Sequence, residues 1–327
     1  MAALAPPVAE VRSAVRRSLT GLPAGATVLV ACSGGADSLA LAAATAFVAP
    51  RLGLRPGLVS VDHGLQPGSA GRAAEVVKWA ADAGLDPAQA VGVTVAGRPG
   101  GPEAAAREAR YRALVECARE HRAVALLTGH TRDDQAETVL LALARGAGPR
   151  GLAGMPQRRE LSGVPLLRPL LDVGREQTRA ACAALGLTPW DDPHNTDPAY
   201  ARARVRHDLL PELVRVLGRG VVTNLARTAR LVAEDTAALD DLAAAALAAA
   251  RVADGLAVAA LTDLPPAVRT RVLHAWAREL GASAAALSYR HVLALDALVT
   301  AWHGQGPVHL PGGLCVSRSA GRLTLAG

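Results

Sequence analysis

The sequence predicts an α/β protein: a doubly wound parallel sheet, followed by a smaller, mainly helical domain that ends in a short β region. Short apolar runs rich in Val and Leu recur through the first half, and amphipathic stretches of helical period separate them. Near residues 218–224 the composition shifts to Ala- and Leu-rich sequence. This shift predicts a boundary after residue 217, with domains 1–217 and 218–327.

Four apolar runs of the first half are predicted strands, and the segments between them are predicted helices. The strands are expected at 27–32, 57–62, 91–95 and 124–128, and the helices at 37–49, 69–83, 102–120 and 132–144. This alternation places ligands at the carboxyl ends of the strands. The Gly- and Arg-rich run 145–155 is expected to hold little regular structure and to form a functional loop, with a helix near 174–185 after it.

The second half is predicted to be helical until its last twenty or so residues. Helices are expected from about 218 to 251, after Pro265-Pro266, and over 288–302. The tail alternates apolar and polar residues around Pro311-Gly312-Gly313 and Ala320-Gly321. This pattern predicts a small antiparallel sheet.

Composition excludes several classes of protein. No uninterrupted apolar stretch reaches the ~20 residues that a membrane span needs. Four charged residues between Glu10 and Arg17 break any apolar segment of a secretory signal. Lys78 is the only lysine and lies within a predicted helix, which argues against a Walker A loop and a pyridoxal enzyme. A cytoplasmic protein without a membrane partner is expected.

Cysteine usage and charge narrow the choice further. The four cysteines are widely separated and form no C-x-x-C pair, which argues against a zinc ribbon or a disulfide framework and favours buried thiols. The net charge of +6 is carried almost wholly by arginine. A basic chain of this kind favours a polyanionic partner such as nucleic acid.

The first motif is Ser33-Gly34-Gly35-Ala36-Asp37-Ser38, which follows the first predicted strand and opens the next helix. Its glycines allow close backbone approach, its serines offer hydroxyls, and the helix N-terminus presents N–H groups; together they predict a phosphate-binding loop. A carboxylate beside phosphate needs a cation, so Asp37 is expected to hold a divalent metal. The alternative is a capped helix with Asp37 favourable to its dipole.

This hexapeptide resembles the pyrophosphate-binding loop of the PP-loop ATP pyrophosphatases. Members of that superfamily cleave ATP between the α and β phosphates and adenylate an oxygen of their substrate. The resemblance therefore implies ATP, Mg²⁺ and an adenylated intermediate, without identifying the substrate.

The second motif is the run TGHTRDDQAET at 128–138, after the fourth predicted strand. Once the helix starts, His130, Asp133, Asp134 and Glu137 stand at i, i+3, i+4 and i+7, on one helical face. Three carboxylates there would repel one another, and a shared cation or a basic ligand would relieve that repulsion. The alternative is an acidic first turn that complements the helix dipole.

Two other polar segments are candidates. Asp62-His63-Gly64-Leu65 ends the second predicted strand at the same edge, where a nucleotide contact and a plain polar turn are equally consistent. In the segment from Trp190 to Arg206, arginines at alternate positions cannot share one helical face, so some are expected to point toward a ligand. Tyr200 and Trp190 are candidates to stack on a base. The alternative is solvated charge beside a helix.

Taken together, these segments resemble the tRNA(Ile)-lysidine synthetases over nearly the whole chain. The matching segments are SGGADS (33–38), VDHGL (61–65) with Ser69 and Glu75-Val76-Val77 after it, Ala106-Arg107 to Arg110-Tyr111, TGHTRDDQAETVLL (128–141), the run 145–155, Arg168 to Leu171, and Asp192 to Arg206. The chain departs from the family at His194 and Ala203, where Ser and Asn are usual. Its short C-terminal region resembles the compact form with one accessory domain.

The resemblance implies ATP-dependent ligation of free L-lysine to C2 of the wobble cytidine of isoleucine tRNA with a CAU anticodon. The cytidine is first adenylated, and the lysine ε-amino group then displaces AMP. Residues 1–217 would form the PP-loop catalytic domain and 218–327 an accessory tRNA-binding domain. The resemblance leaves a homodimer open.

Site roles follow from the same resemblance. ATP is expected at Ser33 to Ser38 with Asp62, His63 and Arg145, and Mg²⁺ at Asp37 with Asp134 or Asp133. Lysine is expected at a carboxylate among Asp133, Asp134 and Glu137, with His130 or that carboxylate as proton acceptor; these assignments are exchangeable. The residues expected to contact the α-phosphate or tRNA are Arg110, Arg150, Tyr200, Arg202, Arg204 (also catalytic), Arg206, Arg227 and Arg230.

Three rival functions differ in what they require. A tRNA-thiolating PP-loop enzyme is expected to bring paired cysteines, and the sequence has none. An amidotransferase-type synthetase would need a glutaminase domain or partner. A non-catalytic adenine-nucleotide sensor on the same fold would leave the three carboxylates and the arginines at 202–206 unexplained.

Overall fold

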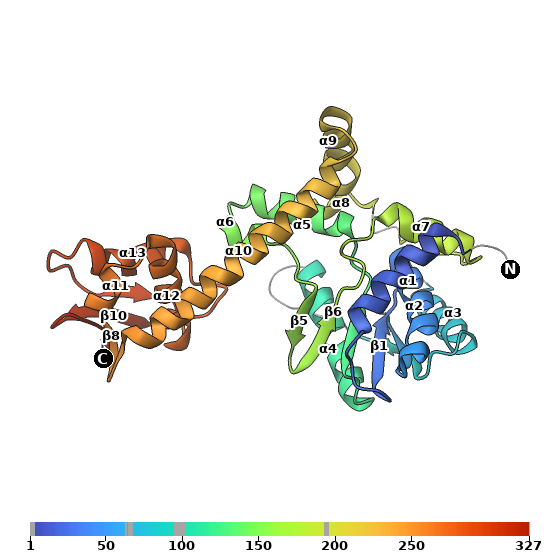
Figure 1. Ribbon diagram of the computed structural model, residues 1–327, viewed down its shortest axis with the longest axis horizontal. Coiled ribbons are helices and arrows are strands. Elements are labelled where there is room, and N and C mark those ends of the chain that lie inside the picture. Colours follow the sequence, from blue (N-terminus) through green and yellow to red (C-terminus); the bar gives the residue numbers. More distant parts are fainter. Residues whose placement is uncertain (1–3, 63, 65–67, 95–101, 193–195, 327) are drawn as a thin grey trace. The chain divides into compact units, whose positions relative to one another are not determined.

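The computed structural model describes residues 4–62, 64, 68–94, 102–192 and 196–326 (Figure 1). Their contacts divide the chain into two compact units, Met1–Leu231 and Val232–Gly327. The division falls inside the long helix α10 (Val221–Ala250). The boundary was predicted after residue 217, which is the end of the preceding helix α9 (Leu210–Leu217).

The first unit contains a sheet in which six described strands run in the order β3-β2-β1-β4-β6-β5. The strands are β1 (Thr27–Ala31), β2 (Arg55–Asp62), β3 (Ala88–Gly92), β4 (Ala125–Thr128), β5 (Arg158–Leu161) and β6 (Val164–Leu167). Neighbours are parallel except β5 and β6, which form an antiparallel hairpin. The predicted doubly wound parallel sheet is confirmed. The hairpin was not predicted, because Arg158 and Arg159 open its first strand and Pro165 interrupts the second.

The helices of the first unit precede, separate or follow these strands along the chain. They are α1 (Pro6–Leu19), α2 (Ala36–Val48), η1 (Pro50–Leu52), α3 (Ser69–Asp82), α4 (Pro102–Glu120), α5 (Arg132–Ala144), α6 (Gly148–Leu152), α7 (Arg175–Ala184) and α8 (Ala201–Arg204), followed by a π-helical turn (Val205–Leu209) that leads into α9. Helix α6 lies within the run 145–155, so the expectation of little regular structure was wrong there. Pro149 in its first turn, where the N–H has no intrahelical partner, favours this short helix.

Alternation along β1 explains the two layers. Val28 and Val30 pack with residues of α1, α2 and α7, which group together in Figure 1. Leu29 points to the opposite face and packs against Leu114 of α4. Because successive strand residues face opposite sides, a strand of apolar residues such as TVLVA must be buried on both faces.

The strand order reverses at β1 and β4, which lie side by side with Ala31 opposite Thr128. In doubly wound sheets this switch point opens a crevice at the carboxyl ends of the strands, where ligands bind. The SGGADS loop follows β1 and the TGHTRDD segment follows β4. The fold therefore brings the two strongest sequence motifs to one crevice.

The second unit contains the end of α10 and a helical layer beside an antiparallel sheet of order β7-β8-β11-β10-β9. Its elements are β7 (Arg251–Val252), β8 (Gly255–Ala257), α11 (Ala259–Thr262), α12 (Pro266–Glu279), α13 (Tyr289–Thr300), β9 (Val308–Leu310), β10 (Leu314–Ser319) and β11 (Arg322–Ala326). The core joins Leu256, Trp276, Leu295 and Val316 from both layers. The predicted helices and β tail are confirmed.

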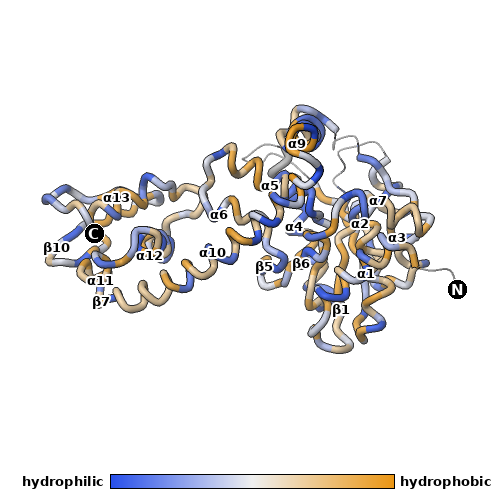
Figure 2. Tube along the Cα trace, turned by 45° about the horizontal axis from the view of Figure 1, so that its top comes forward, coloured by the Kyte–Doolittle hydropathy of each residue, from blue (hydrophilic) through white to orange (hydrophobic). Residues whose placement is uncertain are grey.

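Hydropathy follows this architecture. Along α10, hydrophilic and hydrophobic residues are interleaved (Figure 2). Within the described residues, no helix is both long enough and apolar enough to cross a membrane.

Candidate active site

Polar groups within the loop after β1 hydrogen-bond to one another. The Ser38 hydroxyl donates to the Gly35 carbonyl (2.9 Å) and accepts from the Ser33 N–H (3.2 Å). Gly34 has φ +84°, in the left-handed region that glycine favours, and its carbonyl accepts from the Trp190 N–H (2.9 Å). Gly35 is the N-cap of α2, and a Cβ built there would find no atom closer than 3.7 Å. These contacts fix the turn that leads from β1 into the first turn of α2.

Gly129 holds the two motifs together. A Cβ on this residue would lie 3.0 Å from backbone atoms of Asp37 and Ser38, so the end of β4 contacts the start of α2 directly. Gly129 is part of the sequence motif TGHTRDDQAET, but the sequence predicted no role for it.

We expect Gly129→Ala to weaken ATP binding about tenfold, because the added methyl group must push the start of α2 away from β4 and shift the phosphate loop. Isothermal titration with ATP measures the change. Gly92→Ala, where a Cβ would meet no atom within 4 Å, is the matched control. Equal ATP affinity in both variants would show that this contact does not shape the loop.

Helix α5 begins with a capping box. The Thr131 backbone N–H and hydroxyl both donate to Oδ2 of Asp134 (2.8 and 3.0 Å). Asp133 caps a different helix, because its Oδ2 accepts from the Arg175 N–H at the start of α7 (2.8 Å). Two of the three acidic residues of this face therefore also position helix starts.

Arg175 links the phosphate loop to the acidic face. Its Nη2 donates to Asp134 Oδ1 (2.9 Å), its Nη1 donates to Glu137 Oε1 (3.2 Å), and its Nε lies 3.6 Å from Asp37 Oδ2. On the same helix, Thr178 donates its hydroxyl to Asp37 Oδ1. One guanidinium therefore joins carboxylates from the ends of two strands.

Sequence reasoning missed Arg175 and Thr178. One signal was available, since Arg175 lies in the first turn of the helix predicted near 174–185. A cation is unfavourable at that end of the helix dipole unless it has anionic partners.

Glu137 is fully buried and lies against three guanidiniums. Arg206 Nε donates to Glu137 Oε1 (2.7 Å), Arg202 Nε lies 3.1 Å from Oε2, and Arg175 completes the set. The sequence predicted that a shared cation or a basic ligand relieves the repulsion among these carboxylates. The structure corrects this prediction, because arginines of the same chain already neutralise them.

The arginines at 202–206 divide as their spacing predicts. Arg202 and Arg206, four residues apart, both contact Glu137 of α5. Arg204 is exposed and donates to the carbonyls of Pro198 (2.6 Å) and Ala199 (3.1 Å). The structure therefore brings two of the three into the acidic group and leaves Arg204 outside it.

Electrostatics set the charge of three key groups. Burial raises the pKa of Asp37, only partly opposed by Thr178 and Arg175. Burial would also raise the pKa of Asp134, but Arg175, His130 and the Thr131 N–H outweigh it, so this pKa is lowered. Burial, together with nearby arginines, lowers the pKa of His130 to about 3. His130 is therefore neutral at neutral pH, and its Nδ1 lies 3.0 Å from the Thr128 hydroxyl.

The described residues contain no group of three or more His, Cys, Asp and Glu side chains placed to hold a metal ion by themselves. Asp37 and Asp134 lie on either side of Arg175, and Asp37 has the longer contact with it. Mg²⁺ is commonly held by one or two carboxylates together with phosphate oxygens. This donor set fits Mg²⁺ only in company with phosphate.

The remaining predicted residues are more scattered. Asp62 Oδ1 accepts from the Gly64 N–H (2.9 Å), as in a polar strand-end turn, and His63 lies outside the described residues. Arg145 and Arg150 are exposed at the end of α5 and in α6, and Tyr200 is the N-cap of α8. Arg227, whose guanidinium donates to Asn224 Oδ1 (3.0 Å), and Arg230 lie on α10 in the part that belongs to the first unit. Arg110 lies partly buried on α4.

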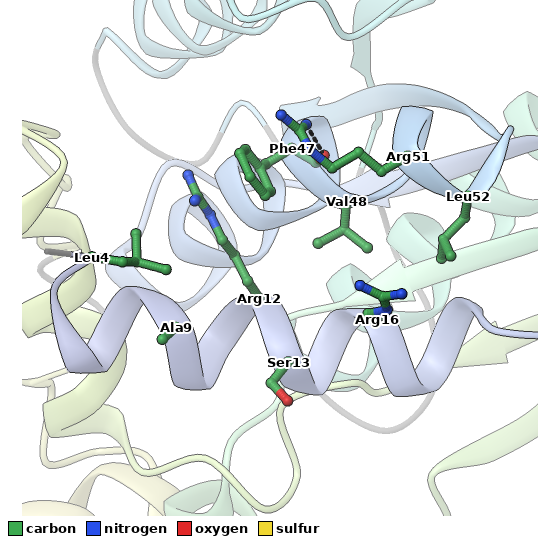
Figure 3. Close-up of a pocket in the computed structure, with 9 residues that line it drawn as sticks. All are labelled: Leu4, Ala9, Arg12, Ser13, Arg16, Phe47, Val48, Arg51 and Leu52. Carbon is green, nitrogen blue, oxygen red and sulfur yellow. Dashed lines mark hydrogen bonds between the residues drawn. The ribbon is translucent and has the colours of Figure 1, made fainter. Parts of the chain in front are cut away.

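A cavity of about 290 Å³ lies away from this site, between α1 and the C-terminal end of α2 (Figure 3). The guanidinium carbons of Arg12 and Arg51 lie 3.4 and 3.5 Å from the centroid of the Phe47 ring, which indicates cation–π stacking. Phe47 stands about three turns after Ala36, about 16 Å along α2. The cavity therefore belongs to the packing of α1 on α2 rather than to the phosphate loop.

Comparison with known proteins places the chain among characterised families. Residues 10–213 match the PP-loop domain model, and residues 256–324 match the model described as the TilS substrate binding domain. The chain is 73% identical over 326 residues to "tRNA(Ile)-lysidine synthase" of Salinispora arenicola, covering 99% of this chain and 98% of the relative. It is 56% identical over 322 residues to the protein of the same name from Thermobifida fusca, covering 98% of each.

A solved structure supports the fold independently. The U34-tRNA thiolase NcsA from Methanococcus maripaludis superposes with a TM-score of 0.57 at 20% sequence identity, covering 70% of this chain and 80% of that one. At this identity the likeness shows the fold alone.

Proposed function

Because the chain belongs to the tRNA(Ile)-lysidine synthase family, we infer that it ligates lysine to C2 of the wobble cytidine of isoleucine tRNA with a CAU anticodon, using ATP. The observation that carries this inference is the meeting of the phosphate loop and the acidic face at one switch point of the sheet. A nucleotide and an amine substrate can react only where their sites adjoin.

The chemistry has two steps. The C2 oxygen of cytosine is a poor leaving group, so it first attacks the α-phosphate of ATP and releases pyrophosphate. The lysine ε-amino group then attacks C2, and AMP departs with the oxygen. The loop Ser33 to Ser38 would bind the phosphates, and Asp37 with Asp134 would hold Mg²⁺, which neutralises phosphate charge when bound.

We assign the lysine ε-ammonium to the acidic face of α5. Asp134 supports this assignment, since its lowered pKa keeps it ionised, and it is partly shared between Arg175 and Arg206. An ammonium ion would replace one of these guanidiniums. Neutral His130 is assigned a hydrogen-bonding role, and the proton acceptor is either His130 or a carboxylate of this face.

The experiment that tests the function is pyrophosphate release by the full-length protein. We expect release to require ATP and isoleucine tRNA with a CAU anticodon, and lysidine to form only when lysine is added. The same tRNA with uridine at the wobble position is the control. Nucleotide binding without turnover would instead favour the nucleotide-sensor alternative.

The partner and location proposals rest on coarser observations. Cys32, Cys117 and Cys182 are buried free thiols, which supports a cytoplasmic, reducing location. We further propose that the second unit, which includes the region matching a substrate-binding domain, selects the tRNA. A homodimer is also proposed, and sedimentation equilibrium tests it.

We expect reversal of charge at Arg227 and Arg230 together to weaken tRNA binding and to make the salt dependence shallower, because each lost phosphate contact lowers the salt slope by about one. Filter binding across a salt series measures both quantities. Arg290→Glu on α13 is the comparison variant for a general loss of positive charge. An unchanged affinity and slope in the double variant would remove α10 from the tRNA interface.

A further inference from the structure

A second group of charged side chains lies beyond His130, and this group is wholly cationic. Arg107 and Arg110 lie on α4, and Arg168 directly follows β6. Tyr111 contacts two of them: its phenol oxygen accepts from Arg107 Nη2 (3.4 Å), and the guanidinium carbons of Arg107 and Arg110 lie 5.0 and 5.4 Å from the centroid of its ring. We call Arg107, Arg110 and Arg168 the arginine cluster.

Arg168 is the most buried member, with 3% of its surface exposed. Its Nη1 donates to the Pro156 carbonyl (2.7 Å), but its buried Nε has no acceptor. Burying a guanidinium is costly unless it is paired and fully hydrogen-bonded. Packing alone does not account for an Nε–H left without a partner in this position.

Arg107 lowers the pKa of both other members of the cluster. On α4, the carboxylate of Glu108 pairs with Arg112 (2.8 Å), outside the cluster. Burial lowers the pKa of Arg168, and Arg159 and Arg107 lower it further. Burial also lowers the pKa of Arg110, with Arg107 and Arg202 adding to the effect. Arg110 and Arg168, the two less exposed members, therefore carry like charges at a cost that an anion would reduce.

The place of the cluster points to a ligand. Arg168 follows β6, whose neighbour β4 leads to His130, so the cluster lies at the same carboxyl edge as the phosphate loop. Charges of both signs act on His130. Asp134 raises its pKa, while Arg168, Arg107 and Arg110 lower it. His130 is therefore close enough to be influenced by both the acidic residue Asp134 and the arginine cluster.

We propose that the arginine cluster binds a phosphate group, with Arg107 and Arg168 as binding residues that adjoin the reacting centre. This proposal rests on the proposed function, whose two phosphate-bearing substrates are ATP and tRNA. Guanidinium groups match phosphate oxygens with paired N–H donors.

Binding measurements test the proposal without turnover. We expect Arg107→Gln and Arg168→Gln each to lose about tenfold in affinity for one phosphate-bearing ligand, the loss of a charged hydrogen bond. If the phosphate belongs to the nucleotide, AMP binding falls and tRNA binding does not. If it belongs to the RNA backbone, tRNA affinity falls and its salt slope drops by about one.

Arg112→Gln, on the same helix but paired with Glu108, is the matched control and should change neither affinity. If Arg168→Gln does not fold, Arg107→Gln and Arg110→Gln carry the test. Affinities for both AMP and tRNA within twofold of wild type in the folded variants would overturn the proposal. Absence of lysidine formation by the wild-type protein would overturn the proposed function instead, because neither binding measurement depends on catalysis.

Discussion

Replacing Asp37 with Asn is expected to lower pyrophosphate release by about 100-fold or more while leaving the melting temperature at or slightly above that of the wild type. Asn keeps the shape of the side chain and can still accept the Thr178 hydrogen bond, but it removes the charge that faces Arg175 and would hold Mg²⁺. A raised pKa means that folding favours the uncharged form of this carboxyl. Neutralising it therefore removes a cost of folding together with the activity.

Release of pyrophosphate and thermal melting of the same preparation measure the two effects. Asp191→Asn is the control, since that side chain is 82% exposed and pairs with an exposed Arg179. A variant with wild-type turnover would remove Asp37 from the metal and phosphate site. A fall in melting temperature by several degrees would show that its charge stabilises the fold.

Replacing Glu137 with Gln is expected to act on both stability and lysine binding. Removing one partner from a buried ionic network typically costs 3–5 kcal/mol, and about 3 kcal/mol is expected here because the three guanidiniums are 18–30% exposed. For a unit of this size that corresponds to a melting temperature lower by roughly 6–12 °C. The KM for lysine is expected to rise more than the KM for ATP.

Thermal melting and steady-state kinetics at a temperature where the variant remains folded separate the two effects. Glu212→Gln serves as control, because Glu212 pairs with Arg215 on the exposed side of α9 and should not change either KM. A larger rise in the KM for ATP than in that for lysine would move the amine site away from α5.

The elements that could be predicted from the sequence are those determined by their own local residue pattern. The runs TVLVA and ALLT are apolar enough to be buried on both faces, so β1 and β4 were expected within one residue of their observed ends. The strand after residue 90 was placed too late, because β3 (Ala88–Gly92) is an edge strand with little apolar alternation. Pairing of β5 with β6 depends on a turn between two short, mixed strands, and no periodic pattern marks it.

The candidate site was less predictable, since most of its contacts join residues far apart in the chain. The motif residues Asp37, Asp134 and Glu137 were found because they form dense patterns after strands. Arg175 was not found, because its partners lie about 40 residues or more away in the chain and it stands alone in its own segment. Only its unfavourable position at a helix start pointed to a partner.

The π-helical turn at Val205–Leu209 has a consequence for how this region can change over evolution. Such a turn contains one residue more per hydrogen-bonded ring than the α-helix around it. Losing that residue would rotate everything after it by about 100° about the helix axis. Arg202 precedes the turn and Arg206 is its second residue, so a deletion between them would separate the two guanidiniums that now share Glu137. Substitutions in this segment are therefore more tolerable than any change in its length.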